Sequence, residues 1–289
     1  MMTESLFPSA CQRVVFSDVD GTLLDRAGHY PACWPSVRQS LGDAMFVLTS
    51  SRTVEELLDV QQALGIAGPF IAENGAMLVL THEWLDQPLG TVVTVGERLL
   101  RLVPIGTPST QLSAIVRGAA STCGVTIDVQ RGITTADLPP TSVGRAPSVT
   151  SHALARAHSI LLRISGTTEQ RLRFFSTLAR TGLTVSHGGR WHVVQGGSSK
   201  GIAVRTLLQL IRRRASHELC VIGVGDAQND RSLLEAVDHR FVMRGPDGTV
   251  DAALADVPGA HVPETSGIEA WSEIVDLMHP ATLEGAADA

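Results

Sequence analysis

The chain has 289 residues, of which 44% are hydrophobic and 18% charged, so it can bury one large or two moderate cores. Its formal net charge of −6 argues against a nucleic-acid partner, because binding to a phosphate backbone needs a basic surface. No apolar run reaches the length of a membrane span, and residues 1–13 lack the pattern of a signal peptide. We therefore expect a cytoplasmic protein without a membrane partner.

The cysteine pattern agrees with that location. The four cysteines lie far apart in the sequence, without a Cys-x-x-Cys pair, at Cys11, Cys33, Cys123 and Cys220. Neither a zinc site nor a disulfide framework is expected from such spacing, and a reducing cytoplasm fits it.

The first part of the chain alternates predicted strands and helices. Its elements are an apolar strand over 14–16, a helix over 31–41, a strand over 44–48, a helix after residue 53 and a strand over 69–72. Thr53 and Glu56 have the spacing of a capping box at the start of the second helix. This alternation favours a parallel sheet with right-handed crossovers, in which polar residues at the strand ends line the ligand crevice.

The middle of the chain has shorter elements and loops rich in Pro, Gly, Ser and Thr. We expect strands over 92–95, 159–165, 184–186 and 190–195, helices over 111–120 and 169–180, and an irregular segment over 137–149. The alternating pattern then returns. We expect a helix that begins within 198–201, a strand over 219–224, a helix over 232–237 and a strand over 240–243. The fold class is therefore α/β, a Rossmann-like doubly wound parallel-sheet core (1–83 and 189–289) with an inserted α+β domain (84–188).

Two aspartates, Asp18 and Asp20, follow the first predicted strand, and Gly21 allows the chain to turn there. Side chains two positions apart point the same way in extended chain, and their charges repel unless a cation or a proton shares the site. Such a pair fits phosphate-ester hydrolysis, which needs a nucleophile and a proton donor. Asp18 is a candidate nucleophile that forms an aspartyl-phosphate, and Asp20 a candidate general acid and then base.

Three further polar clusters fit the same chemistry. Ser50 follows the second strand and could donate a hydrogen bond to a phosphoryl oxygen, and Lys200 opens a helix, where an anion is favoured. Asp226 and Asp230 follow the strand over 219–224 and could hold Mg²⁺ together with Asp18, because Mg²⁺ prefers oxygen ligands.

Each of these residues also has a structural explanation. Ser50 could be one of several hydroxyls at a helix start, Lys200 a surface lysine, and Asp226 and Asn229 turn formers. Alternatively, Asn229 could orient Lys200 or a carboxylate. The ordered set of four clusters, each at a strand end or a helix start, favours the chemical interpretation.

That ordered set, Asp-x-Asp-Gly-Thr-Leu, Ser, Lys and Gly-Asp-x-x-Asn-Asp, resembles the four motifs of the haloacid dehalogenase (HAD) superfamily of phosphohydrolases. The resemblance implies that Asp18 is the nucleophile, Asp20 the acid/base, and Ser50 and Lys200 the phosphate binders. It implies a Mg²⁺ cofactor held by Asp18, the Asp20 carbonyl and Asp226, supported by Asp230 and Asn229. It also implies that the inserted domain is a cap that selects the substrate.

Residues 69–75, 186–192 and 199–201 further resemble the mannosyl-3-phosphoglycerate phosphatases, most clearly in His-Gly-Gly-Arg followed by an aromatic residue. The guanidinium of Arg190 suits a carboxylate or a second phosphate oxygen. The candidate substrate-binding residues are Ser51, Arg52, Asn74, Gly75, Arg156, Gly189, Arg190 and Asn229. Where that family has Arg-Glu-Tyr-Ser/Asp-Glu, this chain has Arg-Ala-His-Ser-Ile over 156–160, so two acids that could hold sugar hydroxyls are replaced.

These observations predict a Mg²⁺-dependent phosphatase, a monomer or homodimer, acting through an aspartyl-phosphate on a small phosphorylated metabolite. Mannosyl-3-phosphoglycerate or a related glycosyl-phosphoglycerate heads the list of substrates. A broad-specificity sugar-phosphate phosphatase, a phosphotransferase or mutase, and a non-catalytic phospholigand-binding module are the alternatives. The presence of both Asp18 and Asp20 weighs against the last of these, because a binding module needs neither nucleophile nor acid.

Overall fold

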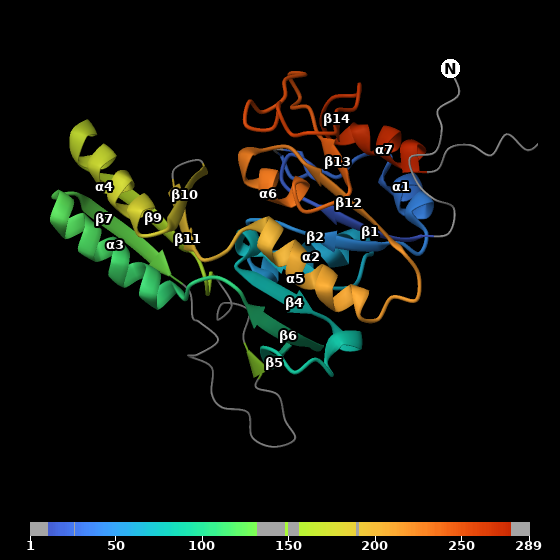
Figure 1. Cartoon of the computed structure of the whole chain (residues 1–289), viewed down its shortest axis with the longest axis horizontal. Coiled ribbons are helices and arrows are strands. Elements are labelled where there is room, and N and C mark those ends of the chain that lie inside the picture. The colour runs from blue at the N-terminus through green and yellow to red at the C-terminus, as the bar shows by residue number, and fades with distance from the viewer. Residues whose placement is uncertain (1–10, 26, 132–147, 150–155, 189–190, 279–289) are drawn as a thin grey trace, which may run out of the picture. The chain divides into compact units, whose positions relative to one another are not determined.

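The computed structural model describes residues 11–25, 27–131, 148–149, 156–188 and 191–278 (Figure 1). The chain divides into two compact units, one formed by residues 1–47 and 208–289 and the other by residues 48–207. In the described part of the chain, no helix is both long enough and apolar enough to cross a membrane.

The first unit is built on a five-stranded sheet in the order β14-β13-β12-β1-β2. Its strands are β1 (Gln12–Ser17), β2 (Met45–Leu48), β12 (Leu219–Gly225), β13 (His239–Val242) and β14 (Ala260–His261). The registers of β1 with β12, β12 with β13 and β13 with β14 are all parallel, which confirms the predicted parallel core. Val14, Val15 and Phe16 in β1 are fully buried, as expected for an interior strand covered on both faces.

Three helices belong to the same unit: α1 (Trp34–Leu41), α6 (Arg231–Leu234) and α7 (Trp271–Met278). Trp34 and Trp271 each contact Phe46 of β2, with ring centroids 5.7 Å apart in both pairs. These aromatic contacts join α1 and α7 to the sheet, because large rings bury much apolar area and favour edge or tilted packing.

Cys11 and Cys220 form a disulfide, with their Cα atoms 5.8 Å apart. The expectation that the cysteines stay unpaired was therefore wrong for these two. Although 209 residues separate them, β1 and β12 are neighbours in the sheet, and Arg13 pairs with Cys220. Strand adjacency, and not sequence spacing, brings the two thiols together. Cys33 and Cys123 are free thiols.

The second unit contains two sheets. One has the order β3-β4-β6-β5-β8, formed by β3 (Phe70–Ala72), β4 (Met77–Leu80), β6 (Arg98–Pro104), β5 (Thr91–Val95) and β8 (Ser148–Val149). The other has the order β10-β11-β9-β7, formed by β10 (Leu183–Gly188), β11 (Trp191–Gly196), β9 (Ile160–Ser165) and β7 (Thr126–Arg131), all antiparallel. The strands predicted over 184–186 and 190–195 correspond to β10 and β11, which pair with each other.

Helices α3 (Ser109–Cys123) and α4 (Thr168–Arg180) pack on one face of the β10-β11-β9-β7 sheet (Figure 1). Leu112 and Phe174 from the helices and Ile160 and Val194 from the strands are fully buried in the core between them. This is the antiparallel sheet with helices on one face that an α+β arrangement requires.

The third predicted strand has a parallel contact, as expected, because Ile71 of β3 forms a parallel bridge with Thr49, just after β2. In its own sheet β3 pairs antiparallel with β4, which was not expected. The turn Glu73–Gly75 causes this pairing, because it sends the chain back alongside β3 instead of into a crossover helix.

Two more helices flank the predicted phosphate-binding residues. The capping box predicted at the start of α2 (Val54–Leu64) is confirmed, with Thr53 N–H donating to Glu56 Oε2 over 2.8 Å. Helix α5 (Lys200–Arg212) begins at the predicted position. The division into segments 1–83, 84–188 and 189–289 stays a prediction, although β4 pairs with β6 and β10 with β11 across its two boundaries.

Candidate active site

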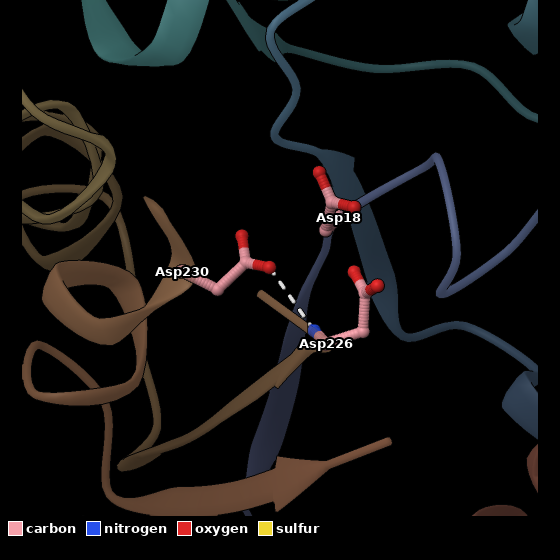
Figure 2. A group of neighbouring side chains, drawn as sticks. All are labelled: Asp18, Asp226 and Asp230. Carbon is pink, nitrogen blue, oxygen red and sulfur yellow. Dashed lines mark hydrogen bonds between the residues drawn. The ribbon is translucent and has the colours of Figure 1, made fainter. Parts of the chain in front are cut away.

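Three carboxylates meet at the carboxyl ends of β1 and β12 in the first unit. Asp18 directly follows β1, and its N–H donates to the carbonyl of Val224 in β12 over 2.9 Å. Asp226 directly follows β12, and Asp230 ends the turn η5 (Gln228–Asp230). One oxygen from each carboxylate lies within 4.8 Å of the other two (Figure 2). The parallel register thus brings together three of the predicted metal ligands.

Hydrogen bonds hold two of these carboxylates in place. Asp230 Oδ2 accepts the N–H groups of Asp226 and Ala227 over 3.0 Å and 3.1 Å (Figure 2 draws the first). Thr22 donates its hydroxyl hydrogen to Asp226 Oδ1 over 3.0 Å. One carboxylate oxygen of Asp226 and one of Asp230 therefore accept hydrogen bonds from the protein. These bonds fix the direction in which the other oxygen of each carboxylate points.

Two glycines are needed for this close packing. A Cβ atom on Gly21, which has φ +93°, would lie 2.2 Å from Asp226 Oδ2. A Cβ atom on Gly225 would lie 2.4 Å from the Cβ of Asp230. Any larger residue at either position would push a carboxylate out of the cluster.

The cluster suits a hard divalent cation. Asp18 is 5% exposed and Asp230 is fully buried, so three like charges stand close together with little water to screen them. Such an arrangement is costly unless a cation or protons compensate it. An all-oxygen donor set fits Mg²⁺ better than zinc, which favours nitrogen and sulfur ligands. The residues present therefore fit a metal ion of this class.

Two other predicted residues, Asp20 and Asn229, lie close in the sequence to members of the cluster. Asp20 is exposed, and its side chain is not among the three grouped carboxylates. Its predicted metal ligand is the backbone carbonyl, and that role stays a prediction. Asn229 is half-buried in the turn η5, directly before Asp230.

In the second unit, Ser50 is fully buried, two residues after the last residue of β2. Its N–H donates to the Ile71 carbonyl over 3.0 Å, and its carbonyl accepts from the N–H of Asn74 over 2.8 Å. Its hydroxyl oxygen accepts the N–H of Arg52 over 3.2 Å. Because a hydroxyl that accepts still has its own hydrogen, Ser50 can donate to an anion. Ser51 and Arg52 are half-buried beside it.

The turn Glu73–Gly75 lies next to Ser50 and has an unusual backbone. Glu73, Asn74 and Gly75 all have positive φ values, of 51°, 55° and 91°. A Cβ atom on Gly75 would lie 2.1 Å from the Ser199 carbonyl oxygen and 2.7 Å from the Lys200 nitrogen. The glycine therefore lets the turn pack directly against the start of α5. Lys200, the first residue of that helix, is 1% exposed.

The side chain of Glu73, which is 1% exposed, reaches across to residues 157–159. Oε1 accepts the N–H of Ala157 over 2.9 Å, and Oε2 accepts the N–H of His158 over 3.1 Å and the hydroxyl hydrogen of Ser159 over 2.5 Å. Burial raises the pKa of the Glu73 carboxyl, while these hydrogen bonds and the charge of Arg156 oppose that rise.

Arg156 itself is half-buried, with φ +52°, and its Nη1 donates to the Ser51 carbonyl over 3.4 Å. Gly189 and Arg190, the remaining predicted substrate-binding residues, lie outside the described residues.

Two residues of this arrangement were not singled out from the sequence. Thr22 belongs to the Asp-x-Asp-Gly-Thr-Leu stretch, and a hydroxyl two residues after Asp20 could have marked it as a hydrogen-bond partner for an acid. Glu73 directly follows an apolar strand and precedes Asn-Gly, and a lone acid at a strand end is a comparable signal. In both cases the partner lies far away in the sequence, so only the fold identifies it.

Comparison with known proteins finds similar sequences over most of the chain. A family model described as haloacid dehalogenase-like hydrolase matches residues 15–89 and 146–258. A glucosyl-3-phosphoglycerate/mannosyl-3-phosphoglycerate phosphatase from Methanococcoides burtonii is 26% identical over 275 residues, which cover 92% of this chain and 97% of that protein.

Two solved structures show the same fold. One, from Thermoplasma acidophilum, has a TM-score of 0.62 at 18% identity and covers 93% of this chain and 100% of its own. The other, a HAD-superfamily phosphatase from Bacteroides thetaiotaomicron, has a TM-score of 0.61 at 16% identity and covers 94% of this chain and 98% of its own.

Proposed function

Because the chain belongs to the haloacid dehalogenase-like hydrolases, we propose that it is a Mg²⁺-dependent phosphatase acting on phosphate monoesters of small metabolites. We place a glycosyl-phosphoglycerate, such as mannosyl-3-phosphoglycerate, first among its substrates. The likeness to the Methanococcoides burtonii phosphatase, which extends over nearly the whole length of both chains, supports that choice.

The main support for the proposal is the cluster of Asp18, Asp226 and Asp230. Its three carboxylates offer oxygen ligands at the end of a parallel sheet, where ligands bind in open α/β folds. Asp18, Asp226 and Asp230, with the Asp20 carbonyl, would hold Mg²⁺. When bound, the ion would neutralise charge between the carboxylates and the phosphate, two anions that otherwise repel.

The proposed reaction has two steps that use the chain's own residues. In the first, a carboxylate oxygen of Asp18 forms a bond to phosphorus while the ester P–O bond breaks, and the Asp20 carboxyl gives its proton to the leaving oxygen. In the second, the Asp20 carboxylate takes a proton from water as the water oxygen attacks phosphorus and the aspartyl-phosphate bond breaks. Inorganic phosphate leaves, and both aspartates return to their starting states.

The proposal assigns the phosphoryl oxygens to Ser50 and Lys200. Ser50 has a hydroxyl hydrogen to donate, and Lys200 offers a positive charge at the start of α5, where the helix dipole also favours an anion. Ser51, Arg52, Asn74, Gly75, Arg156, Gly189, Arg190 and Asn229 remain the proposed substrate-binding residues.

One observation favours a second candidate, a broad-specificity sugar-phosphate phosphatase. Ala157 and Ile160 occupy positions where mannosyl-3-phosphoglycerate phosphatases have acids, and they are 2% and 0% exposed. These side chains offer no hydrogen bond to a sugar hydroxyl. A site without those contacts would distinguish less sharply between sugars.

Phosphate release from a panel of glycosyl-phosphoglycerates, phosphoglycerates and hexose phosphates tests the proposal. We expect release with Mg²⁺, none with EDTA, and a loss of at least about 10³-fold in kcat for Asp18→Asn, because the two-step route is then closed. Asp43→Asn, at an exposed position in the same unit, is the matched control and should keep wild-type activity.

The pattern across the panel separates the candidates. A preference for one glycosyl-phosphoglycerate supports the first, and slow release from many hexose phosphates supports the second. Phosphate transfer to an added alcohol in place of water would identify a phosphotransferase. No metal-dependent turnover of any ester would contradict the proposal.

A further inference from the structure

Glu73 is a buried carboxylate to which the proposed reaction assigns no role. It lies between three segments of the second unit that carry proposed ligand-binding residues: 50–52, 73–75 and 156–159. Its backbone N–H donates to the Arg52 carbonyl over 2.9 Å, and its side chain accepts three hydrogen bonds from residues 157–159. One residue therefore joins all three segments.

The backbone is strained both at the turn Glu73–Gly75 and at Arg156, next to the residues that Glu73 binds. Glu73, Asn74 and Arg156 are the described residues other than glycine with positive φ. Such a conformation is unfavourable for most L-residues and persists where the surroundings hold it. The hydrogen bonds from Ala157 and His158 to Glu73 immediately follow Arg156, so they hold its left-handed conformation in place.

Arg156 keeps most of its hydrogen-bonding capacity for a ligand. A guanidinium has five N–H donors, and within the described residues that of Arg156 donates one hydrogen bond, to Ser51. It is only half-buried, so an anion can reach it. Its planar set of donors matches a carboxylate in two-point contact, which requires a fixed orientation.

We propose that Glu73 is a positioning residue for substrate binding: it holds residues 156–159 against the turn Glu73–Gly75 and so fixes Arg156 to receive a second anionic group of the substrate, a carboxylate. This inference deepens the proposed function and rests on it.

A matched pair of ligands, 3-phosphoglycerate and glycerol 3-phosphate, tests the proposal, since they differ in whether a carboxylate or a hydroxymethyl group stands beside the phosphate ester. Binding is measured by calorimetry with Mg²⁺, and phosphate release gives KM and kcat. In Glu73→Gln the amide nitrogen cannot accept from a backbone N–H, so one hydrogen bond is lost. Glu97→Gln, at an exposed position of the same unit, is the control.

We expect Glu73→Gln to raise Kd and KM for 3-phosphoglycerate by about tenfold and to change those for glycerol 3-phosphate by less than about twofold. Arg156→Ala should give the same selective loss. The double variant should lose no more than Arg156→Ala alone, because both substitutions remove one coupled interaction. A purely structural role for Glu73 would weaken both ligands equally.

Ser159→Ala removes one of the three hydrogen bonds to the Glu73 side chain. It replaces Glu73→Gln as the test variant if Glu73→Gln does not fold. It should show the same selectivity, with a rise of about two- to fourfold. Equal losses for both ligands, or additive losses in the double variant, would overturn the positioning role while leaving the phosphatase proposal standing. Wild-type protein that neither binds nor hydrolyses any phosphate ester would overturn both.

Discussion

Thr22 donates its hydroxyl hydrogen to Asp226 Oδ1 over 3.0 Å, across a separation of 204 residues in the chain. Thr22 is fully buried, and its carbonyl accepts the indole N–H of Trp271 over 2.9 Å. The threonine thus links a carboxylate of the proposed metal site to the aromatic packing beneath α7. It orients that carboxylate without being a ligand itself.

Replacing Thr22 should weaken metal binding selectively. Thr22→Val keeps the shape of the side chain but removes the hydrogen bond, so Asp226 loses its fixed orientation. Groups that orient metal ligands typically contribute about 10–100-fold to affinity, and we expect the Mg²⁺ concentration for half-maximal activity to rise about tenfold. Thr22→Ser keeps the hydroxyl and should stay within about threefold. Equal Mg²⁺ requirements for the two variants in a titration of phosphate release would contradict this role.

Gly75 should tolerate no side chain. Gly75→Ala introduces both a positive φ and a Cβ atom 2.1 Å from the Ser199 carbonyl oxygen. Gly96→Ala is the matched control, because Gly96 also has a positive φ, of 59°, but no atom within 4 Å of an added Cβ. The control should lose about 1–2 kcal/mol of unfolding free energy, and Gly75→Ala clearly more. Urea unfolding measures both, and equal losses would show that the turn can move away from α5.

The pH dependence of stability should carry a contribution from His158. Burial lowers the pKa of this imidazole, whose Nδ1 donates to the Gly106 carbonyl over 2.9 Å. Within the described part of the chain, the buried Nε2 has no hydrogen-bond partner, so protonation there would create an uncompensated charge. The folded state therefore favours the neutral ring.

Since the folded pKa lies below the unfolded value of about 6.5, the unfolded state binds more protons between the two. The stabilising contribution of the neutral ring is present above pH 6.5 and is lost as the pH falls below it. We expect wild type to lose more unfolding free energy than His158→Gln between pH 7.5 and pH 5.5. His82→Gln, at an exposed position, should keep the wild-type slope. Parallel slopes for all three proteins would contradict the assignment.

The disulfide between Cys11 and Cys220 predicts a specific thiol count. Denatured, unreduced protein should have two alkylatable thiols, those of Cys33 and Cys123, and reduced protein all four. Reduction should also lower the unfolding free energy by about 2–5 kcal/mol, because the bond closes a long loop. Mass spectrometry after alkylation gives the count. Four labelled cysteines without reductant would show that the two thiols are close but unbonded.

Local sequence patterns were enough to predict the types and order of most elements in both units, because such patterns depend on residues a few positions apart. The apolar run Val14–Phe16 predicted a buried strand, and Thr53 with Glu56 predicted the cap of α2. Asp18, Asp226 and Asp230 could be chosen as joint metal ligands on the same basis, since the carboxyl ends of parallel strands share one edge of a sheet. Strands β4, β6, β7, β8 and β14 and helix α7 were not foreseen, and β8 lies in the segment 137–149 that was expected to be irregular.

The partners of residues far apart in the chain, by contrast, follow from the three-dimensional fold and could not be predicted from local patterns. The adjacency of β1 and β12 sets both the carboxylate cluster and the Cys11–Cys220 bond. The reversal at Glu73–Gly75 returns the chain as β4, antiparallel to β3, and directs the Glu73 carboxylate to residues 157–159. Such contacts depend on strand order and on left-handed backbone held by distant hydrogen bonds, and neither leaves a periodic trace in the sequence.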